Sequence, residues 1–362
     1  MTALPPIRSH FHWRKWAIPV FLGTGAAVAM LWWSLDQEVL DPDTQSMTTS
    51  RALLQSFEWT ARASWALLAV LGCVLLRDAA YIIRLRMLSF KQFSWKQSFD
   101  HIILWELASA LTPSVVGGSA MAILILKRGG MSGGQSMATV FVTALLDELF
   151  YLVAVPFFLL LSFTAGHAIF PPDTGLGFGA SIPWVFGIAY AFIALLTGII
   201  FMGILHSPEG THRWLNRLSR WKIIQKWSAG VRQWSVDLLE ASQNMRKRSS
   251  AFWLQAWGTT LLSWTARFLT LNMILLVFFE TVPHAAVLAR QMVLWLALTL
   301  SPTPGSSGIA EVALPAFLGD LVGFGYLAAV AIIWRLATYF LYLFLGAWVL
   351  PGWISRTSTA AP

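Results

Sequence analysis

Charged residues are scarce in this sequence, and so is cysteine. Asp, Glu, Lys and Arg make up 12% of the 362 residues, whereas 57% are hydrophobic and 20 are tryptophan. Soluble domains average about 25% charged residues, so this composition excludes a soluble globular protein. We predict an all-α polytopic integral membrane protein that forms a single transmembrane domain over residues 1–362.

Several kinds of functional site are missing as well. The single cysteine, Cys73, lies in an apolar stretch and cannot form a disulfide within one chain. No Cys/His cluster or nucleotide-binding loop is visible, so we expect no metal and no cofactor, and an ATP-driven pump would need a separate subunit. The basic residues are scattered and match no nucleic-acid module, which argues against nucleic acid as a partner.

Long apolar stretches define the predicted topology, since a spanning helix needs about 20 apolar residues. Two of these stretches, about 98–130 and 286–320, are interrupted by Pro and Gly. The first uninterrupted stretch follows a basic segment but lacks a small-residue cleavage site, so we interpret it as a retained helix rather than a signal peptide. The full spans predicted are residues 16–35, 60–83, 136–163, 182–205, 251–279 and 324–350.

The positions of Lys and Arg predict the orientation. They gather before the first span, in residues 84–96 after the second, and within 207–250, whereas 165–180 contains neither. Because basic loops stay cytoplasmic, both termini are expected inside. The net charge of +8 mostly reflects this bias. We expect a multi-pass protein of the bacterial cytoplasmic (inner) membrane whose basic face attracts anionic headgroups, each basic residue contributing about 1 kcal/mol.

The 207–250 loop has an amphipathic pattern. Trp214, Leu218, Trp221 and Ile224 recur at helical spacing among Arg and Lys. This pattern is typical of a helix that lies in the plane of the lipid headgroups. We interpret the loop as an interfacial anchor, and a partner-binding or gating element is the alternative.

The two broken stretches resemble each other. LTPSVVGGSAMAILILKRGG (111–130) aligns weakly with SPTPGSSGIAEVALPAFLGD (301–320), so that Thr112-Pro113 matches Thr303-Pro304. Three full spans separate them, and re-entrant segments at these positions would open to opposite sides as an inverted repeat. Transporters are often built this way, with broken helices meeting at the membrane midplane. Two Pro-kinked helices that simply cross are the alternative.

Ionisable residues inside the spans form polar stripes. Asp147 shares a helical face with Thr139, Thr143 and Tyr151, and the adjacent Glu148 points about 100° away, the turn per residue of an α-helix. A carboxylate or guanidinium facing lipid costs roughly 2.5–3.5 kcal/mol, so these groups must face one another or water.

Two arginines also share a helical face with other polar residues. Arg267 has Thr260, Ser263 and Thr270 on its face, while Arg335 has Thr338, Tyr339 and Tyr342. Either arginine paired with Asp147 or Glu311 would be a transport site or a structural bridge. Two other charged residues, Arg77 and Asp78, are interpreted as structural, reaching the headgroups from a helix end.

The glycines of the broken segments have two interpretations. Gly117, Gly118, Gly305 and Gly308 permit tight turns. Their N–H groups and the helix N-termini that follow would alternatively form an anion site suited to a phosphate.

These motifs carry a family resemblance. TPSVVGG, LKRGG, ATVFVTALLDELFY and PTPGSSGIAE, with Arg335 in the closing helix, resemble the flippase-like family typified by the transmembrane domain of lysylphosphatidylglycerol synthetase. The resemblance covers about residues 15–350 and implies movement of a lipid across the bilayer. The sequence departs at Ser306 and Ser307, where glycine is frequent, and at Gly118, where some relatives have Glu. It shows no aminoacyl transferase domain, so we expect no lysyl-lipid synthesis.

We therefore predict a membrane transporter, not an enzyme, that moves an anionic or aminoacylated phospholipid by alternating access. The alternatives are a flippase for isoprenoid phosphates or other glycolipid precursors, a non-transporting scaffold of a lipid-synthesis complex, and an intramembrane serine protease with Ser307 as nucleophile. The serine protease lacks a base, since no histidine lies securely within a span. The predicted transport-site residues are Glu106, Pro113, Gly117, Gly118, Asp147, Glu148, Arg267, Pro304, Gly305, Gly308, Glu311 and Arg335.

Overall fold

The structure is a computed structural model that describes most of the chain. The described residues are 25, 28, 29, 32, 33, 35–40, 46–112, 114–171, 182–221, 228–299, 301 and 303–359. Most of the predicted first span (16–35) and Pro113 lie outside them. Before the first long helix, the strands β1 (Glu38–Leu40) and β2 (Met47–Thr49) pair antiparallel, and the short helix α2 (Ser50–Gln55) follows.

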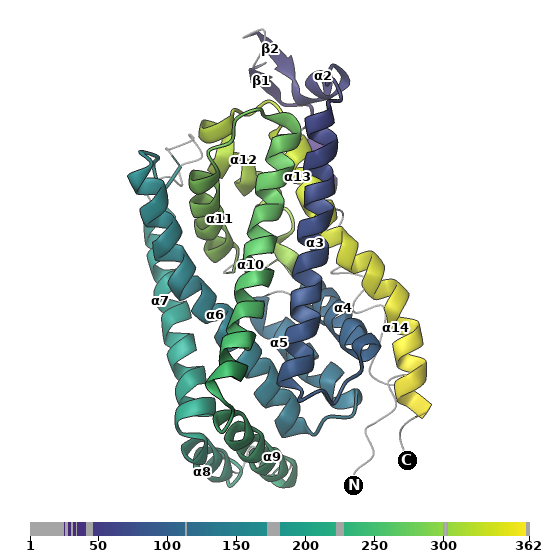
Figure 1. Cartoon of the computed structure of the whole chain (residues 1–362), viewed down its shortest axis with the longest axis vertical. Coiled ribbons are helices and arrows are strands. Elements are labelled where there is room, and N and C mark those ends of the chain that lie inside the picture. Colours follow the sequence, from purple (N-terminus) through teal and green to yellow (C-terminus); the bar gives the residue numbers. More distant parts are fainter. Residues whose placement is uncertain are drawn as a thin grey trace.

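Long apolar helices run along the molecule (Figure 1). In the described part of the chain, five are long and apolar enough to cross a membrane. This confirms the predicted all-α polytopic class. The elements concerned are α3 (Ala61–Leu88), α6 (Gly133–Thr164), α7 (Ile182–Ile200) with its π-helical extension η2 (Phe201–His206), α10 (Ser250–Phe278), and α13 (Leu327–Arg335) continued by η5 (Leu336–Phe340) and α14 (Leu341–Thr359).

Polar caps fix where several of these helices begin. The Ser132 hydroxyl accepts a bond from the Gln135 backbone at the start of α6, and the Gln135 side chain accepts one in return from the Ser132 backbone. Thr60 and Ser249 cap α3 and α10 in the simpler way, with the side chain accepting from a backbone N–H. Each cap satisfies amides that the helix itself leaves unpaired.

Each predicted broken segment is a helical hairpin. The first hairpin consists of α4 (Trp95–Leu111) and α5 (Ser114–Arg128). It folds back on itself, because a Cβ added at Gly129, just after α5, would lie 2.5 Å from the ring of His101 near the start of α4. The crossing of two kinked helices, which was the alternative, does not give this contact.

The second hairpin consists of α11 (His284–Thr299), the 3₁₀ turn η4 (Pro304–Ser306) and α12 (Ile309–Val322). Arg290 on α11 binds Asp320 at the far end of α12, so this segment also returns toward its starting side. The first hairpin occupies the lower half of the molecule and the second the upper half (Figure 1).

The tips of the two hairpins meet near the middle of the molecule. A Cβ added at Gly305 in the second tip would lie 3.2 Å from the carbonyl oxygen of Ala110 in the first. Hairpins that enter from opposite ends and meet half-way are the geometry predicted from the internal repeat.

Two groups of buried apolar residues surround the hairpins. Leu314 of the second hairpin packs with Leu275 of α10 and Val330 of α13, while Ile103 of the first packs with Val349 of α14. Lipid is as apolar as these side chains, so close packing rather than hydrophobic transfer holds the helices together.

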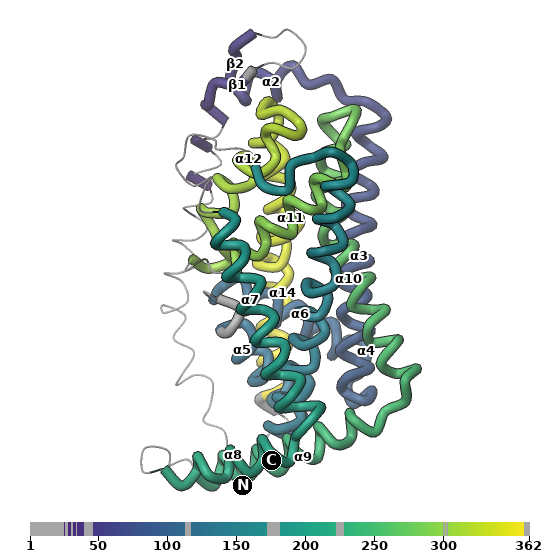
Figure 2. The backbone as a smooth tube through the Cα atoms, turned by 90° about the vertical axis from the view of Figure 1, so that its left-hand side faces the viewer, coloured from purple at the N-terminus to yellow at the C-terminus, as the bar shows by residue number. Residues whose placement is uncertain are grey.

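In its described residues, the 207–250 loop forms two helices that run across the lower end of the molecule (Figure 2). They are α8 (Pro208–Leu218) and α9 (Ser228–Arg246). His212 and Asn216 of α8 hydrogen-bond to Ser235 of α9, which leaves Trp214 and Trp221 60% and 58% exposed. Leu218 is half-buried, and Ile224 lies outside the described residues.

Candidate functional site

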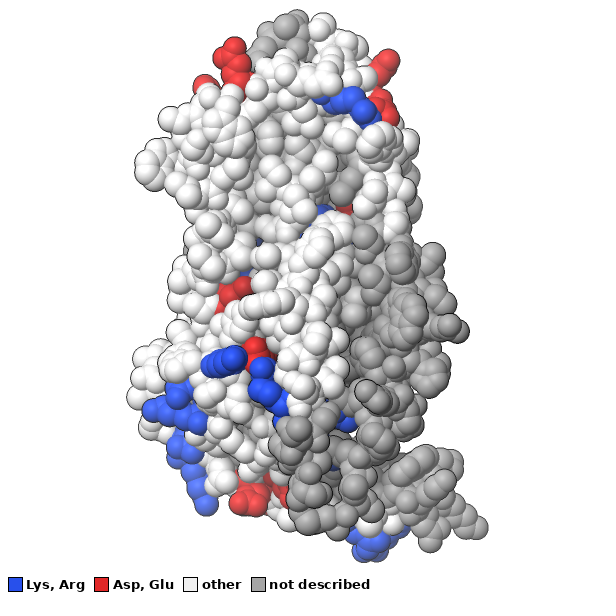
Figure 3. Space-filling view, turned by 90° about the vertical axis from the view of Figure 1, so that its right-hand side faces the viewer, with Lys and Arg blue, Asp and Glu red and all other residues white. Residues whose placement is uncertain are grey.

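A cavity of about 300 Å³ with charged side chains in its walls lies where the hairpin tips meet. Its walls come from α3 to α7, from α10 to α14, and from the turns η4 and η5. Among the predicted site residues, those that line it are Glu106, Asp147, Glu148, Arg267, Gly305 and Arg335. On the face with α3 and α14, charged side chains are visible half-way along an otherwise mostly uncharged surface, and basic ones gather toward the lower end (Figure 3).

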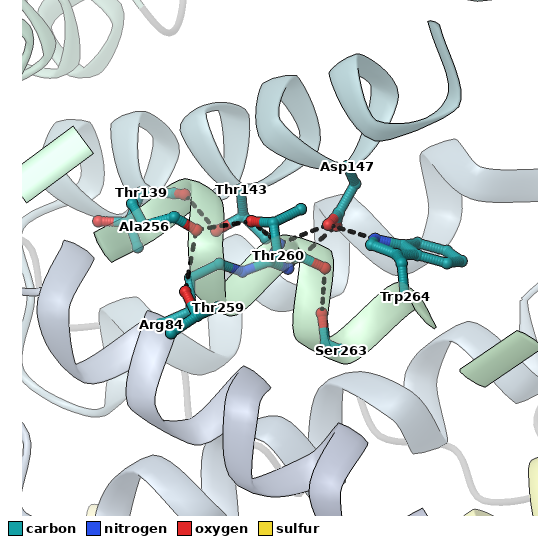
Figure 4. A network of polar contacts seen from close by, with 9 residues as sticks. All are labelled: Arg84, Thr139, Thr143, Asp147, Ala256, Thr259, Thr260, Ser263 and Trp264. Atoms are coloured by element: carbon teal, nitrogen blue, oxygen red, sulfur yellow. Dashed lines mark hydrogen bonds and ion pairs between the residues drawn. The ribbon is translucent and has the colours of Figure 1, made fainter. Parts of the chain in front are cut away.

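One wall of the cavity is an ion pair between α3 and α6 (Figure 4). The Arg84 guanidinium donates to both carboxylate oxygens of Asp147, at 2.5 and 3.1 Å, and to the Thr260 hydroxyl at 2.9 Å. The Trp264 indole N–H also donates to Asp147, at 2.7 Å. The bidentate arginine and the indole N–H together satisfy the half-buried Asp147 carboxylate from several sides.

This pair corrects one prediction. Arg84 was grouped with the basic residues after the second span, but α3 continues to Leu88 and Arg84 is buried inside it. Asp147 therefore pairs with Arg84, not with Arg267 or Arg335. The signal in the sequence was helical spacing, since Arg77, Tyr81 and Arg84 lie on one face of a helix.

The tip of the second hairpin is held by Arg335. Its Nε lies 2.7 Å from a carboxylate oxygen of Glu311, as one of the predicted pairings requires. The same guanidinium donates to the carbonyl oxygen of Gly305 at 3.2 Å and to the Ser307 hydroxyl at 3.0 Å. Arg335 also lies over the Tyr339 ring, 4.1 Å from its centroid.

A further arginine bridges α3 to the first hairpin. Arg77 donates to Glu106 at 2.5 Å and to Asp78 at 3.1 Å, and it contacts the Tyr342 hydroxyl, which in turn donates to Asp78 at 2.8 Å. Arg77 is buried. The interpretation of Arg77 and Asp78 as residues that reach the lipid headgroups is therefore wrong, because both face the interior of the bundle.

Arg267 differs from the other arginines of the cavity. It is half-buried, and its guanidinium lies 4.4 Å from the centroid of the Trp295 ring and 5.1 Å from that of Trp264. Within the described part of the chain it forms no hydrogen bond or ion pair of the kind that holds Arg84 and Arg335. Stacked aromatic rings position a cation without using its hydrogen-bond donors, so those donors remain available to a ligand.

Unpaired polar atoms also face this region. The Oε2 of Glu148 and the hydroxyl of Tyr151 are buried and have no hydrogen-bond partner among the described residues. Both residues line the cavity, although the sequence placed Glu148 about 100° away from Asp147 on the helix. A buried polar atom without a partner is costly and is commonly found where a ligand binds.

The predicted glycines have separate structural roles. Gly117 and Gly118 pack against α4, where a Cβ at Gly118 would lie 2.4 Å from the Ser109 hydroxyl oxygen. Gly305 has a φ of 55°, and a Cβ there would lie 2.3 Å from the Tyr339 ring. The N–H of Gly308 donates to Glu311 at 2.7 Å. Only Gly305 of these four lines the cavity.

The backbone conformation at the tip of the second hairpin concerns two other residues of the PTPGSSG motif. Pro304 begins the 3₁₀ turn, and Ser306 has a φ of 54°, a conformation that glycine adopts more readily. Ser307 is buried, and its hydroxyl accepts a bond from Arg335, whose guanidinium cannot act as a base. This environment does not support the serine-protease alternative.

The described residues include no group of three or more His, Cys, Asp or Glu side chains that could hold a metal ion. The cavity walls contain guanidinium groups and the carboxyl groups of Glu106, Asp147 and Glu148. An arginine with free donors beside unpaired polar oxygens is suited to bind an anionic group that also carries hydrogen-bond donors.

Comparisons with known proteins agree with the motifs and the fold. A family model described as the lysylphosphatidylglycerol synthase TM region matches residues 17–346. The chain is also similar to a UPF0104 membrane protein of Archaeoglobus fulgidus, with 26% identity over 303 residues that cover 79% of this chain and 86% of that protein. The chain therefore belongs to the lysylphosphatidylglycerol synthase transmembrane family.

Proposed function

We propose that the protein is a flippase, which moves the headgroup of an anionic or aminoacylated phospholipid between bilayer leaflets through the cavity at the hairpin tips. The observation that carries this proposal is Arg267, a cation held by aromatic rings beside the cavity, with no hydrogen-bond or ion-pair partner among the described residues. Non-helical backbone at membrane depth is tolerated where it lines a polar cavity, and the turn at Gly305 does so.

In the proposed mechanism, the phosphate of the headgroup binds the Arg267 guanidinium, whose fork matches two phosphate oxygens. Arg84 and Arg335 keep their carboxylate partners and form the fixed walls of the site. A cavity of about 300 Å³ accommodates a headgroup, and the acyl chains stay in the surrounding lipid. The two hairpins then open the site alternately to each side.

The Lys and Arg residues of the 207–250 loop, which contains α8 and α9, support an orientation with this end of the molecule in the cytoplasm. We place the protein in the cytoplasmic membrane, with α8 and its exposed Trp214 at the inner headgroup layer. An isoprenoid phosphate presents the same anionic group to Arg267, so both lipid classes belong in the test.

The test is leaflet accessibility of fluorescent lipids in liposomes that contain the purified protein. The panel holds zwitterionic, anionic and basic phospholipids and an isoprenoid phosphate. We expect one headgroup class to cross faster than in protein-free vesicles. We expect Arg267→Gln to slow that crossing about 10- to 100-fold, since a hydrogen bond to a charged group contributes roughly 1.5–3 kcal/mol.

Arg248→Gln is the matched control. Arg248 also lies over aromatic rings, 4.2 Å from the centroid of Phe90, but it is exposed and does not line the cavity. Its replacement should leave crossing unchanged. Absence of crossing for every lipid with a folded wild-type protein would favour the scaffold alternative instead.

A further inference from the structure

The cavity carries an imbalance of charge. The charged residues that line it, together with every member of the ion-pair networks to which they belong, comprise four arginines and five carboxyl groups, because Arg77 joins Glu106 of the cavity wall to Asp78 behind it. These residues are Arg77, Arg84, Arg267 and Arg335 with Asp78, Glu106, Asp147, Glu148 and Glu311. A surplus negative charge inside a membrane protein is unfavourable, and one bound proton removes it.

Geometry distinguishes Glu148 from the other carboxyl groups. Asp147 and Glu311 are bound by Arg84 and Arg335, and Asp78 and Glu106 share Arg77. Glu148 forms no hydrogen bond or ion pair within the described part of the chain, and its Oε2 is buried. A carboxylate stabilised by an arginine keeps its charge, whereas a buried one without a donor binds a proton.

Other titratable and charged side chains line the same cavity as Glu148, and they come from several surrounding helices. Asp147 is the adjacent carboxylate on the same helix, and its negative charge favours the protonated form of Glu148. The other titratable or charged side chains that line the cavity are Tyr81 and Arg84 of α3, Glu106 of α4, Tyr151 of α6, Arg267 of α10, Arg335 of α13, Tyr339 of η5 and Tyr342 of α14.

Given the proposed headgroup transport, on which this inference rests, we infer that Glu148 is a proton-binding site that couples the crossing of an anionic headgroup to the movement of one proton in the same direction. A phosphate at Arg267 adds negative charge to the cavity and so strengthens proton binding at Glu148. By linkage, the proton strengthens phosphate binding by the same factor.

The proton is taken up by the Glu148 carboxylate from water on one side and released to water on the other. One negative charge and one proton cross together, so the step is electroneutral. It therefore responds to a pH difference across the membrane and not to voltage. At equilibrium, each pH unit supports about a tenfold ratio of lipid between the leaflets, because one pH unit corresponds to about 1.4 kcal/mol.

The experiment uses liposomes with a fluorescent anionic phospholipid and an imposed pH difference of one unit, with the membrane potential clamped at zero. For the wild-type protein, the labelled lipid should accumulate up to about tenfold in the leaflet facing the alkaline side. Glu148→Gln should still let the lipid equilibrate between leaflets but without accumulation at any pH difference. Glu240→Gln, at an exposed carboxylate of α9, should behave as the wild type does.

A second measurement needs no variant. A pH-sensitive dye inside wild-type vesicles should report proton entry that accompanies the lipid, at one proton per lipid. Lipid that crosses at the same rate and to equal levels with and without the pH difference would overturn the coupling but not the flippase. Accumulation driven by voltage alone, or by pH in Glu148→Gln, would overturn it too. Absence of any lipid movement would instead refute the proposed function.

Discussion

At the tip of the second hairpin, Arg335 reaches back from α13 and binds Gly305, Ser307 and Glu311, all of which belong to that hairpin. The first hairpin contributes a different carboxylate, Glu106 on the side of α4, and its arginine comes from α3. The second hairpin is thus fastened at its tip to the helix that follows it, whereas the first is fastened along its side to the helix that precedes it.

This difference suggests which parts would move as units. In the described part of the chain, no ion pair joins one hairpin to the other, and the tips meet through Gly305 and Ala110. We expect α13 to move with the second hairpin and α3 with the first. Relative motion of such units is what alternating access requires.

The largest effect should come from breaking the second tip. Arg335→Ala leaves Glu311 buried without its partner, which costs about 3–5 kcal/mol. We expect a large loss of thermal stability in detergent and no lipid crossing. Arg335→Lys keeps the charge but loses the guanidinium fork, so its effect should be intermediate. A stability of Arg335→Ala equal to that of the wild type would contradict the role given to this pair.

The second-largest loss of stability is expected at the base of the second hairpin. Arg290 is fully buried and binds Asp320 as well as the carbonyl oxygens of Ala168 and Phe317. Asp320 is 30% exposed, so water can solvate it once its partner is gone. We expect Arg290→Ala to lower the free energy of unfolding by about 3 kcal/mol, at the lower end for a buried pair, measured by thermal unfolding.

Replacing one glycine by alanine in each hairpin compares how tightly the two tips are packed. At Gly305 the added methyl group would meet the Tyr339 ring, and the backbone is left-handed, so Gly305→Ala should cost about 2 kcal/mol. At Gly118 the nearest atom is the Ser109 hydroxyl oxygen, which can rotate away, and Gly118→Ala should cost about 1 kcal/mol. Unfolding midpoints of the two variants give the test, and the reverse order would refute the tip geometry.

The smallest effect is expected at the base of the first hairpin. Arg356 of α14 binds Asp100 of α4 at 2.5 Å, but its side chain is 49% exposed. Asp100 is 8% exposed, so removing its carboxylate by Asp100→Asn leaves only the half-exposed Arg356, which water can solvate, and should cost about 1 kcal/mol or less. A cost as large as that of Arg290→Ala, by the same unfolding measurement, would show that the two hairpins are fastened alike.

Much of this arrangement could be read from the sequence. The hairpins followed from Pro and Gly within apolar stretches. The cost of isolated charge in a membrane left four arginine–carboxylate pairings open, and one of them, Glu311 with Arg335, is present in the structure. The position of Arg84 was not predicted, because an apolar window ends at the first cluster of basic residues even when the helix continues beyond it. The burial of Arg290 was not predicted either, because the interpretation of its broken segment rested on the prolines and glycines.

Other features depend on three-dimensional contacts that spacing alone does not determine. Trp264 lies three residues before Arg267 on the same helix, but nothing in the sequence indicates that Trp295 of α11 packs against the same guanidinium. The burial of Glu148 without a donor likewise depends on which side chains α3 and α10 bring to the cavity.

The most direct test of headgroup passage is to block the cavity. Thr299 lines it, and Cys73 can be replaced by alanine so that Thr299→Cys carries the only thiol. We predict that modification with a bulky thiol reagent stops lipid crossing in liposomes, and that the transported lipid slows the modification. Undiminished crossing by fully modified protein would contradict the account, because the headgroup would then have to take another path.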